Sequence, residues 1–141
     1  MIVADSNLIA SCVLESSATE DALRLRQSDP DWRVPQLWRY EVLNIMSTMI
    51  KAGRLDKHVA LTLYSGLLAA LVPGEHDSSA KAVLDLVSAY GITGYDAQFV
   101  ALAIELDCTL YTQDKELLEK FPAIAKPFYV KGSQDTASER A

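Results

Sequence analysis

The sequence has little of what several common kinds of protein site require. It contains two cysteines, Cys12 and Cys108, which do not make a disulfide framework or a zinc site. Its 13 Lys and Arg residues are outnumbered by 19 Asp and Glu residues, and the net charge is −6. Because Lys and Arg hold phosphate backbones, this balance argues against a broad nucleic-acid-binding surface. It leaves open a site in which several acids bind divalent cations, since such ions reverse the local charge.

Long hydrophobic runs are missing as well. The longest apolar stretch, residues 59–73, contains polar residues and is too short to span a bilayer. No basic segment precedes an apolar run at the N-terminus, so we expect no signal peptide, no membrane contact and a cytoplasmic location. Half of the 141 residues are hydrophobic, which predicts one globular domain over residues 1–130. The polar tail, residues 131–141, is expected to be disordered.

Short apolar segments alternate with helical patterns along the chain. Strands are expected at residues 1–4, 32–35, 71–73, 108–111 and 128–130. Helices are expected at residues 16–27, 36–51, 56–70, 77–89, 93–106 and 114–120. Strands separated by helices favour an α/β fold of three layers, α/β/α, around a central parallel sheet of about five strands.

Two acidic residues follow predicted strands. Asp5 comes after the first strand, and Asp114 comes shortly after the strand at residues 108–111. The carboxyl ends of parallel strands form the usual ligand crevice of an open α/β sheet. If these two strands are neighbours, both carboxylates emerge at the same edge. Each acid can equally be a helix N-cap or a turn residue.

Two more acidic residues lie on predicted helices. Glu41 shares an apolar face with Trp38 and Ile45, where a carboxylate is costly unless it is paired, hydrogen-bonded or metal-bound. The alternative is an acid at the edge of that face with its head in solvent. Asp96 follows Thr93 by three residues, which resembles a capping box. However, the helix that it opens is apolar nearly all round, so its N-terminus should face the interior or a cleft.

Together these four carboxylates predict a metal site. In one cleft they would repel one another, which would raise their pKa values, and hard divalent cations relieve that repulsion. Oxygen-only ligands suit Mg²⁺ or Mn²⁺. The chemistry that fits such a site is phosphoryl transfer or phosphodiester hydrolysis, in which the metal activates water and neutralises the developing charge.

Four stretches of the chain resemble the PIN-domain ribonucleases, and more closely the VapC-type toxins of bacterial toxin–antitoxin pairs. They are residues 3–9 (VADSNLI), 34–44 (VPQLWRYEVLN), 93–103 (TGYDAQFVALA) and 111–114 (YTQD), in the order and spacing of the family. The resemblance implies a metal-dependent endoribonuclease whose products carry a 5′ phosphate. The acids that it assigns to catalysis and to Mg²⁺ or Mn²⁺ are Asp5, Glu41, Asp96 and Asp114. It also implies that Asn7 and Thr112 orient carboxylates or water.

The resemblance further implies an RNA substrate, a homodimer and a cognate antitoxin that reaches into the acidic cleft. The predicted hairpin of residues 36–51 and 56–70 looks like the groove that such a partner fills, although ordinary core helices show the same pattern. The basic residues that are candidates for contact with RNA phosphates, or else solvated surface cations, are Arg39, Lys51, Arg54 and Lys115.

Two other functions were weighed against the ribonuclease hypothesis. A haloacid-dehalogenase-like phosphatase also places an Asp after its first strand, but it uses a second Asp two residues later, where this chain has Asn7. A non-catalytic interaction module would use the PIN scaffold to bind an antitoxin-like protein or RNA. The presence of all four acids argues against that module.

Overall fold

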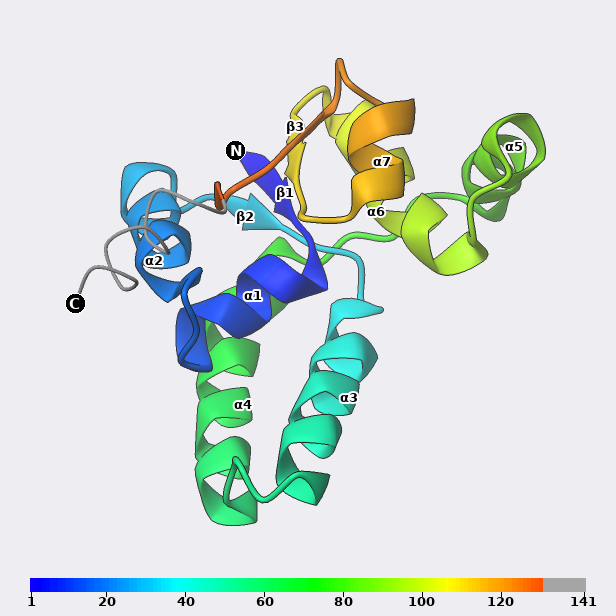
Figure 1. The fold of residues 1–141 in the computed structure, drawn as a ribbon. Coiled ribbons are helices and arrows are strands. Elements are labelled where there is room, and N and C mark those ends of the chain that lie inside the picture. The colour runs from blue at the N-terminus through cyan, green and yellow to red at the C-terminus, as the bar shows by residue number, and fades with distance from the viewer. Residues whose placement is uncertain (131–141) are drawn as a thin grey trace.

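A parallel sheet of four strands forms the centre of the computed structural model, which describes residues 1–130 (Figure 1). The strands are β1 (Ile2–Ala4), β2 (Trp32–Arg33), β3 (Thr109–Tyr111) and β4 (Ala125–Lys126). Their order is β2-β1-β3-β4, and every pair is parallel. Because β1 and β3 are neighbours, the segments that follow them leave the sheet at the same edge.

Helices connect the strands throughout residues 1–130. They are α1 (Ser6–Val13), α2 (Thr19–Ser28), α3 (Trp38–Lys51), α4 (Lys57–Leu71), the 3₁₀ helix η1 (Val72–Gly74), α5 (Ala80–Tyr90), α6 (Gly94–Leu106) and α7 (Lys115–Lys120). Asp56 caps α4 by accepting hydrogen bonds from two backbone N–H groups, and Gly91 ends α5 with a φ of 67°. None of the described helices has the length and apolar character that crossing a lipid bilayer requires.

Two hydrophobic cores cover the two faces of the sheet. Ile2 and Ala4 of β1 pack in a core built from α1 to α4, whereas Val3 packs in a core built around α5, α6 and α7. Successive side chains of a strand point to opposite faces, so this alternation places helices on both sides of the sheet. Figure 1 shows α1 to α4 gathered on one side of β1 and α5 to α7 on the other. The three-layer α/β/α prediction is therefore confirmed, with four strands where about five were expected.

Two predicted strands are wrong. Residues 71–73 end α4 and begin η1, and Glu75 makes only an isolated bridge to Val34. Residues 128–130 form no strand, because the backbone N–H groups of Phe128 and Tyr129 donate to the Oε1 atom of Gln113. The last strand lies earlier, at Ala125–Lys126.

The structure also differs from the sequence prediction within residues 1–30. Helix α1 begins directly after β1 and was not predicted, and the helix expected at residues 16–27 begins only at Thr19. Ser16 does not cap that helix; its backbone N–H instead donates to the Thr19 hydroxyl. The tail predicted to be disordered, residues 131–141, lies outside the described residues.

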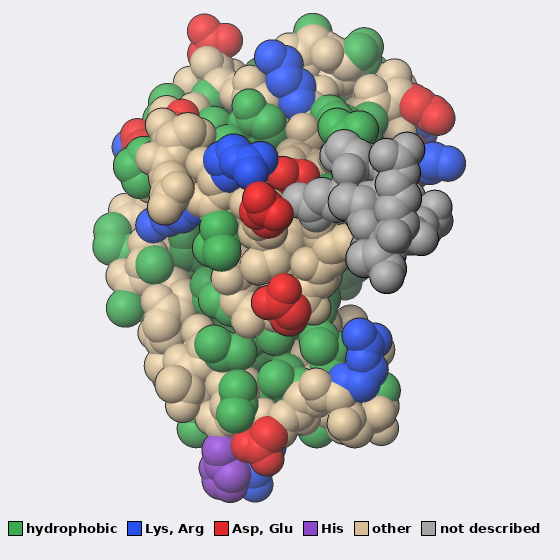
Figure 2. Space-filling model, turned by 60° about the vertical axis from the view of Figure 1, so that its left-hand side comes forward, with side chains coloured by type: hydrophobic (Ala, Val, Ile, Leu, Met, Phe, Trp, Pro, Cys, Tyr) green, Lys and Arg blue, Asp and Glu red, His purple; other side chains and the backbone are tan. Residues whose placement is uncertain are grey.

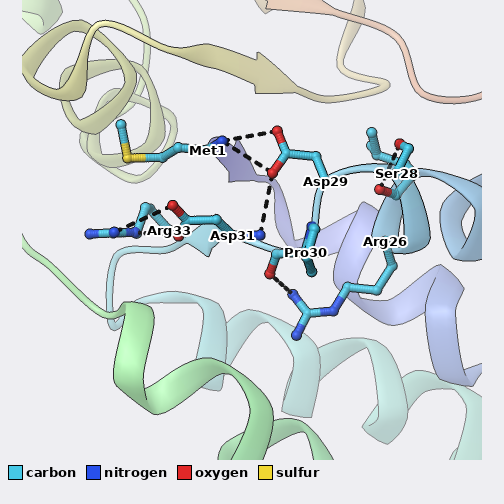
Figure 3. A network of polar contacts seen from close by, with 8 residues as sticks. Met1, Arg26, Ser28, Asp29, Pro30, Asp31 and Arg33 are labelled. Atoms are coloured by element: carbon cyan, nitrogen blue, oxygen red, sulfur yellow. Dashed lines mark hydrogen bonds and ion pairs between the residues drawn. The ribbon is translucent and has the colours of Figure 1, made fainter.

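A polar network fixes the N-terminus beside the loop between α2 and β2 (Figure 3). The Met1 ammonium group pairs with the Asp29 carboxylate at 2.9 Å, and the hydrogen bond raises the pKa of that amino group. Arg33 Nε donates to Asp31 Oδ1 at 2.8 Å. Such exposed pairs contribute little stability. The Met1–Asp29 pair nevertheless ties the start of β1, the strand that leads to Asp5, to the loop that enters β2.

Gly74 lies where two backbone segments approach too closely for a side chain. A Cβ atom at this position would overlap the carbonyl oxygen of Trp32, and Gly74 itself accepts a hydrogen bond from Val34 N at 3.1 Å. We expect Gly74→Ala to lower the free energy of unfolding by about 1–3 kcal/mol, because the backbone has to move. Chemical denaturation measures this loss. Gly66→Ala on α4 is the matched control: no atom lies within 4 Å of its Cβ position, so the variant should be neutral or more stable. An equal loss in both variants would contradict the prediction.

Candidate active site

The four acidic residues selected from the sequence line one cavity at the carboxyl edge of the sheet. Its volume is about 630 Å³. The residues that line it are Asp5, Ser6, Asn7, Leu37, Tyr40, Glu41, Asn44, Ile45, Tyr95, Asp96 and Asp114. No Lys or Arg belongs to this described lining. The fold thus brings together carboxylates from α3, α6 and the ends of two strands.

Asp5 both caps α1 and faces the cavity. Its Oδ1 accepts a hydrogen bond from Ser6 N at 2.7 Å, and its Oδ2 accepts one from the Thr112 hydroxyl at 2.5 Å. Burial raises the pKa of Asp5, the two hydrogen bonds oppose that change, and the charge of Asp114 adds to it. The N-cap interpretation from the sequence is confirmed, and it does not remove Asp5 from the site.

Thr112 links two of the acids. Its fully buried hydroxyl donates to Asp5 and accepts the backbone N–H of Asp114 at 3.0 Å. Asp114 in turn caps α7, because its Oδ1 accepts from Leu117 N at 3.0 Å. One buried hydroxyl therefore sets the relative positions of the segments that follow β1 and β3.

Glu41 is held by a residue that the sequence did not single out. The hydroxyl of Ser6, which is buried, donates to Glu41 Oε1 at 2.7 Å. Burial raises the pKa of Glu41, and the charges of Asp5 and Asp96 add to this, while the Ser6 hydrogen bond opposes it. Glu41 thus does not hold its head freely in solvent, although it is only half-buried.

The resemblance implies that Asn7 orients a carboxylate or water, whereas the hydroxyl that holds Glu41 belongs to Ser6. Asn7 is exposed in the cavity lining, and its side chain makes no hydrogen bond to another described residue. Ser6 and Asn7 are the first two residues of α1. Because that helix was not predicted, the direction of each side chain did not follow from the sequence, and no other local signal marks Ser6.

Asp96 lies in the first turn of α6 and lines the cavity. Its backbone N–H donates to the Thr93 hydroxyl at 3.0 Å, as in a capping box. Burial raises the pKa of Asp96, and the charges of Asp114 and Asp5 raise it further. A hydrogen bond between Thr93 and the Asp96 side chain opposes this rise in pKa. Repulsion from neighbouring carboxylates therefore adds to the effect of burial at this position.

The donor set of the cavity fits a hard divalent cation in its chemistry. Its lining offers four carboxylates and two side-chain amides, all oxygen donors, with no competing cationic side chain. In the side-chain positions of the described residues, no three His, Cys, Asp or Glu groups stand close enough to hold one ion. Ligation by three acids therefore requires side-chain rotation. Rotation of the Asp96 carboxylate would give up its hydrogen bond with Thr93.

The basic residues proposed to contact RNA do not lie in the cavity lining. Arg39 makes two hydrogen bonds to the Glu75 carboxylate, at 2.7 and 2.8 Å, and this pairing raises the pKa of Arg39. Glu75 also accepts the indole N–H of Trp38 at 3.2 Å. Arg39 therefore holds α3 against the segment after η1. Three others are exposed on the surface: Lys51, Arg54 and Lys115.

An apolar groove runs between α3 and α4. It has a volume of about 420 Å³ and is lined by Leu43, Met46, Ser47, Ile50, Lys51, Lys57, Ala60, Leu61 and Tyr64. Leu61 is 64% exposed and Leu43 is 44% exposed. Figure 2 shows hydrophobic side chains at the surface over the lower part of the molecule, where this helical hairpin lies. A groove is thus present on the hairpin that the sequence resemblance assigned to a partner.

Comparisons with known proteins agree with this architecture. The family model for the PIN domain matches residues 2–124. The chain is 30% identical over 129 residues to Ribonuclease VapC3 of Pyrobaculum aerophilum, covering 89% of this chain and 98% of that protein. The crystal structure of PAE2754 from the same organism superposes with a TM-score of 0.71 at 22% identity, over 99% of this chain and 87% of that one. A toxin–antitoxin complex from Klebsiella pneumoniae gives 0.67 at 15% identity, over 92% and 98%. At these identities the two structures show likeness of fold alone.

Proposed function

This chain belongs to the PIN-domain family, and on that premise we propose that it is a divalent-metal-dependent endoribonuclease acting at the acidic cavity. The observation that carries the proposal is the convergence of Asp5, Glu41, Asp96 and Asp114 in one cavity whose described lining has no cationic side chain. The name of the VapC3 relative supports RNA as the substrate. Membership of the PIN family also argues against a haloacid-dehalogenase-like phosphatase.

The same four acids are the proposed ligands of Mg²⁺ or Mn²⁺. When bound, the ion supplies a Lewis acid that activates water and neutralises the charge developing on the phosphate. Thr112 and Ser6 hold the carboxylates of Asp5 and Glu41 in place by donating hydrogen bonds to them. Asn7 presents an amide to the cavity, where it can orient a water molecule or a phosphate oxygen.

An antitoxin is the proposed protein partner. Ribonuclease VapC3 and the complex from Klebsiella pneumoniae support a toxin–antitoxin role for this chain. The apolar groove between α3 and α4 offers a surface on which a partner helix can bury its apolar face. A cytoplasmic homodimer belongs to the same proposal, and light scattering of the purified protein would test the dimer.

A non-catalytic interaction module is the second candidate function. One observation favours it, namely that no three acids of the described residues stand at ligating distance as the side chains lie. Such a module would bind RNA or protein but would not cleave RNA in the presence of any divalent ion. An RNA cleavage assay with added metal therefore separates the two candidates.

Metal removal is the direct test of the proposed function. We expect the purified protein to cleave single-stranded RNA in Mg²⁺ or Mn²⁺, and EDTA to slow cleavage by at least about 100-fold, because water activation and charge neutralisation are lost together. Gel electrophoresis of an end-labelled RNA measures the rate, and excess Mg²⁺ added back should restore it. Undiminished cleavage in EDTA would overturn the metal dependence. No cleavage with any added ion would favour the non-catalytic module.

A further inference from the structure

Two tyrosines of the cavity lining are exposed to an extent that internal packing does not explain. Tyr40 is 67% exposed and Tyr95 is 66% exposed, the highest values of any aromatic residue within residues 1–130. The next is Tyr90 at 45%, and its ring packs against Phe121 with centroids 4.6 Å apart. Neither the Tyr40 nor the Tyr95 hydroxyl makes a hydrogen bond to another described residue, and neither ring packs on another aromatic ring there. These rings therefore contribute little to holding the described fold together.

Both tyrosines occupy the same position relative to an acid of the site. Tyr40 immediately precedes Glu41 on α3, and Tyr95 immediately precedes Asp96 on α6. Consecutive residues of an α-helix are about 100° apart around its axis. When the acid points into the cavity, the preceding side chain lies at its rim, and both rings indeed belong to the cavity lining. Two separate helices thus place an exposed ring beside a carboxylate of one cavity.

Within residues 1–130, the cavity lacks side chains that could hold RNA by charge, and these rings offer another way to bind it. Its described lining has four acids and no Lys or Arg, so no side chain there can hold an RNA phosphate by charge. Aromatic rings instead bind unpaired bases by stacking, which tolerates any sequence because every base has a π-face. Bases in a duplex are already stacked, so they are not available to such rings.

We propose that Tyr40 and Tyr95 stack on nucleobases that flank the scissile phosphate, and that they make the cavity select single-stranded over double-stranded RNA. The inference rests on the proposed ribonuclease function and names how that site holds its substrate. Stacking needs the ring and not the hydroxyl. A phenylalanine at either position should therefore preserve RNA binding, whereas an alanine should weaken it.

Equilibrium binding tests the proposal separately from cleavage. A short fluorescein-labelled RNA of mixed sequence is titrated in Mg²⁺ against protein carrying Asp96→Asn, which keeps the RNA intact, and anisotropy gives the Kd. Tyr40→Ala and Tyr95→Ala should each weaken binding of the single strand by roughly 5-fold to 100-fold. The corresponding phenylalanine variants should stay within about two-fold of the parent. Leu84→Ala on α5, which removes a side chain that is 63% exposed and outside the cavity, is the control and should change nothing.

Several results would overturn the stacking proposal. One is an alanine variant that binds the single strand as tightly as its parent. Another is an equal loss of affinity for a duplex of the same sequence, which would indicate contact with the backbone instead of the bases. Absence of RNA binding by the parent also overturns it. Alanine variants that keep RNA affinity but release a co-purified protein would assign the tyrosines to a protein contact. Failure of the ribonuclease function shows separately, as absence of cleavage by the wild-type protein.

Discussion

Asp96→Asn is expected to slow RNA cleavage by at least about 100-fold while leaving the protein folded. The Asp96 carboxylate lines the cavity and is hydrogen-bonded to Thr93, and asparagine keeps a side-chain oxygen at that place, so the replacement removes the charge of a proposed metal ligand while preserving the cap of α6. Asparagine keeps the shape of the side chain and removes its charge. Single-turnover cleavage of a labelled RNA in Mg²⁺ or Mn²⁺ measures the loss.

The melting temperature of the metal-free protein tests whether the fold survives this change. The pKa of Asp96 is raised in the folded chain by burial and by the charges of Asp114 and Asp5. Between the ordinary and the raised pKa, the folded protein binds more protons than the unfolded chain, so this carboxyl makes stability fall as pH rises through that interval. Asparagine carries no such penalty. In EDTA at neutral pH, Asp96→Asn should therefore melt at the same temperature as the wild type or higher.

Addition of Mg²⁺ should raise the melting temperature of the wild type relative to that of Asp96→Asn. Binding to the folded state stabilises it, so the wild-type melting temperature should rise, and that of Asp96→Asn should rise less. The matched control is Asp107→Asn at the other end of α6, where the residue has a φ of 50° that asparagine also tolerates. This control should cleave like the wild type. Equal cleavage and an equal Mg²⁺ shift in Asp96→Asn would remove Asp96 from the site.

Trp38→Ala should cause the largest loss of stability, about 3–5 kcal/mol in the free energy of unfolding. The indole is fully buried, packs against Tyr64 with ring centroids 5.9 Å apart, and donates to the Glu75 carboxylate at 3.2 Å. Its loss leaves a cavity beneath α3, the helix that carries Glu41. Because native domains are stable by only about 5–15 kcal/mol, a large share of the stability would be removed. Urea denaturation followed by circular dichroism measures the loss.

A pair of conservative variants separates packing from hydrogen bonding in that prediction. Trp38→Phe removes the hydrogen bond to Glu75, whereas the indole N–H of Trp32 is buried and has no hydrogen-bond partner among residues 1–130. Trp32→Phe therefore removes a polar group that is already unsatisfied, and it should destabilise the protein less than Trp38→Phe does. The reverse order would show that the Glu75 contact contributes nothing to stability.

Sequence patterns predict the acidic residues of the site but not all of the residues that hold them in place. Asp5 and Asp114 were identified because acids that follow neighbouring parallel strands meet at one edge, and the pairing of β1 with β3 fulfils that condition. Glu41 was identified because it interrupts an apolar helical face. No sequence pattern marks the buried hydroxyl of Ser6, because serine after an acid is common in turns and helix starts and carries no periodic signal.

Local patterns in the sequence determined the helix limits at Asp56 and Gly91, the burial of α6 and the α/β class, because capping and periodicity act within a few residues. Tertiary structure decided whatever depends on partners distant in the chain. Gln113 takes the backbone N–H groups of residues 128 and 129 and so prevents the strand predicted there. Glu75 pairs with Arg39 outside the cavity lining. The meeting of α3 and α6 at the carboxyl edge of the sheet likewise turns separate acids into one cavity, because only the packed chain sets distances between remote side chains.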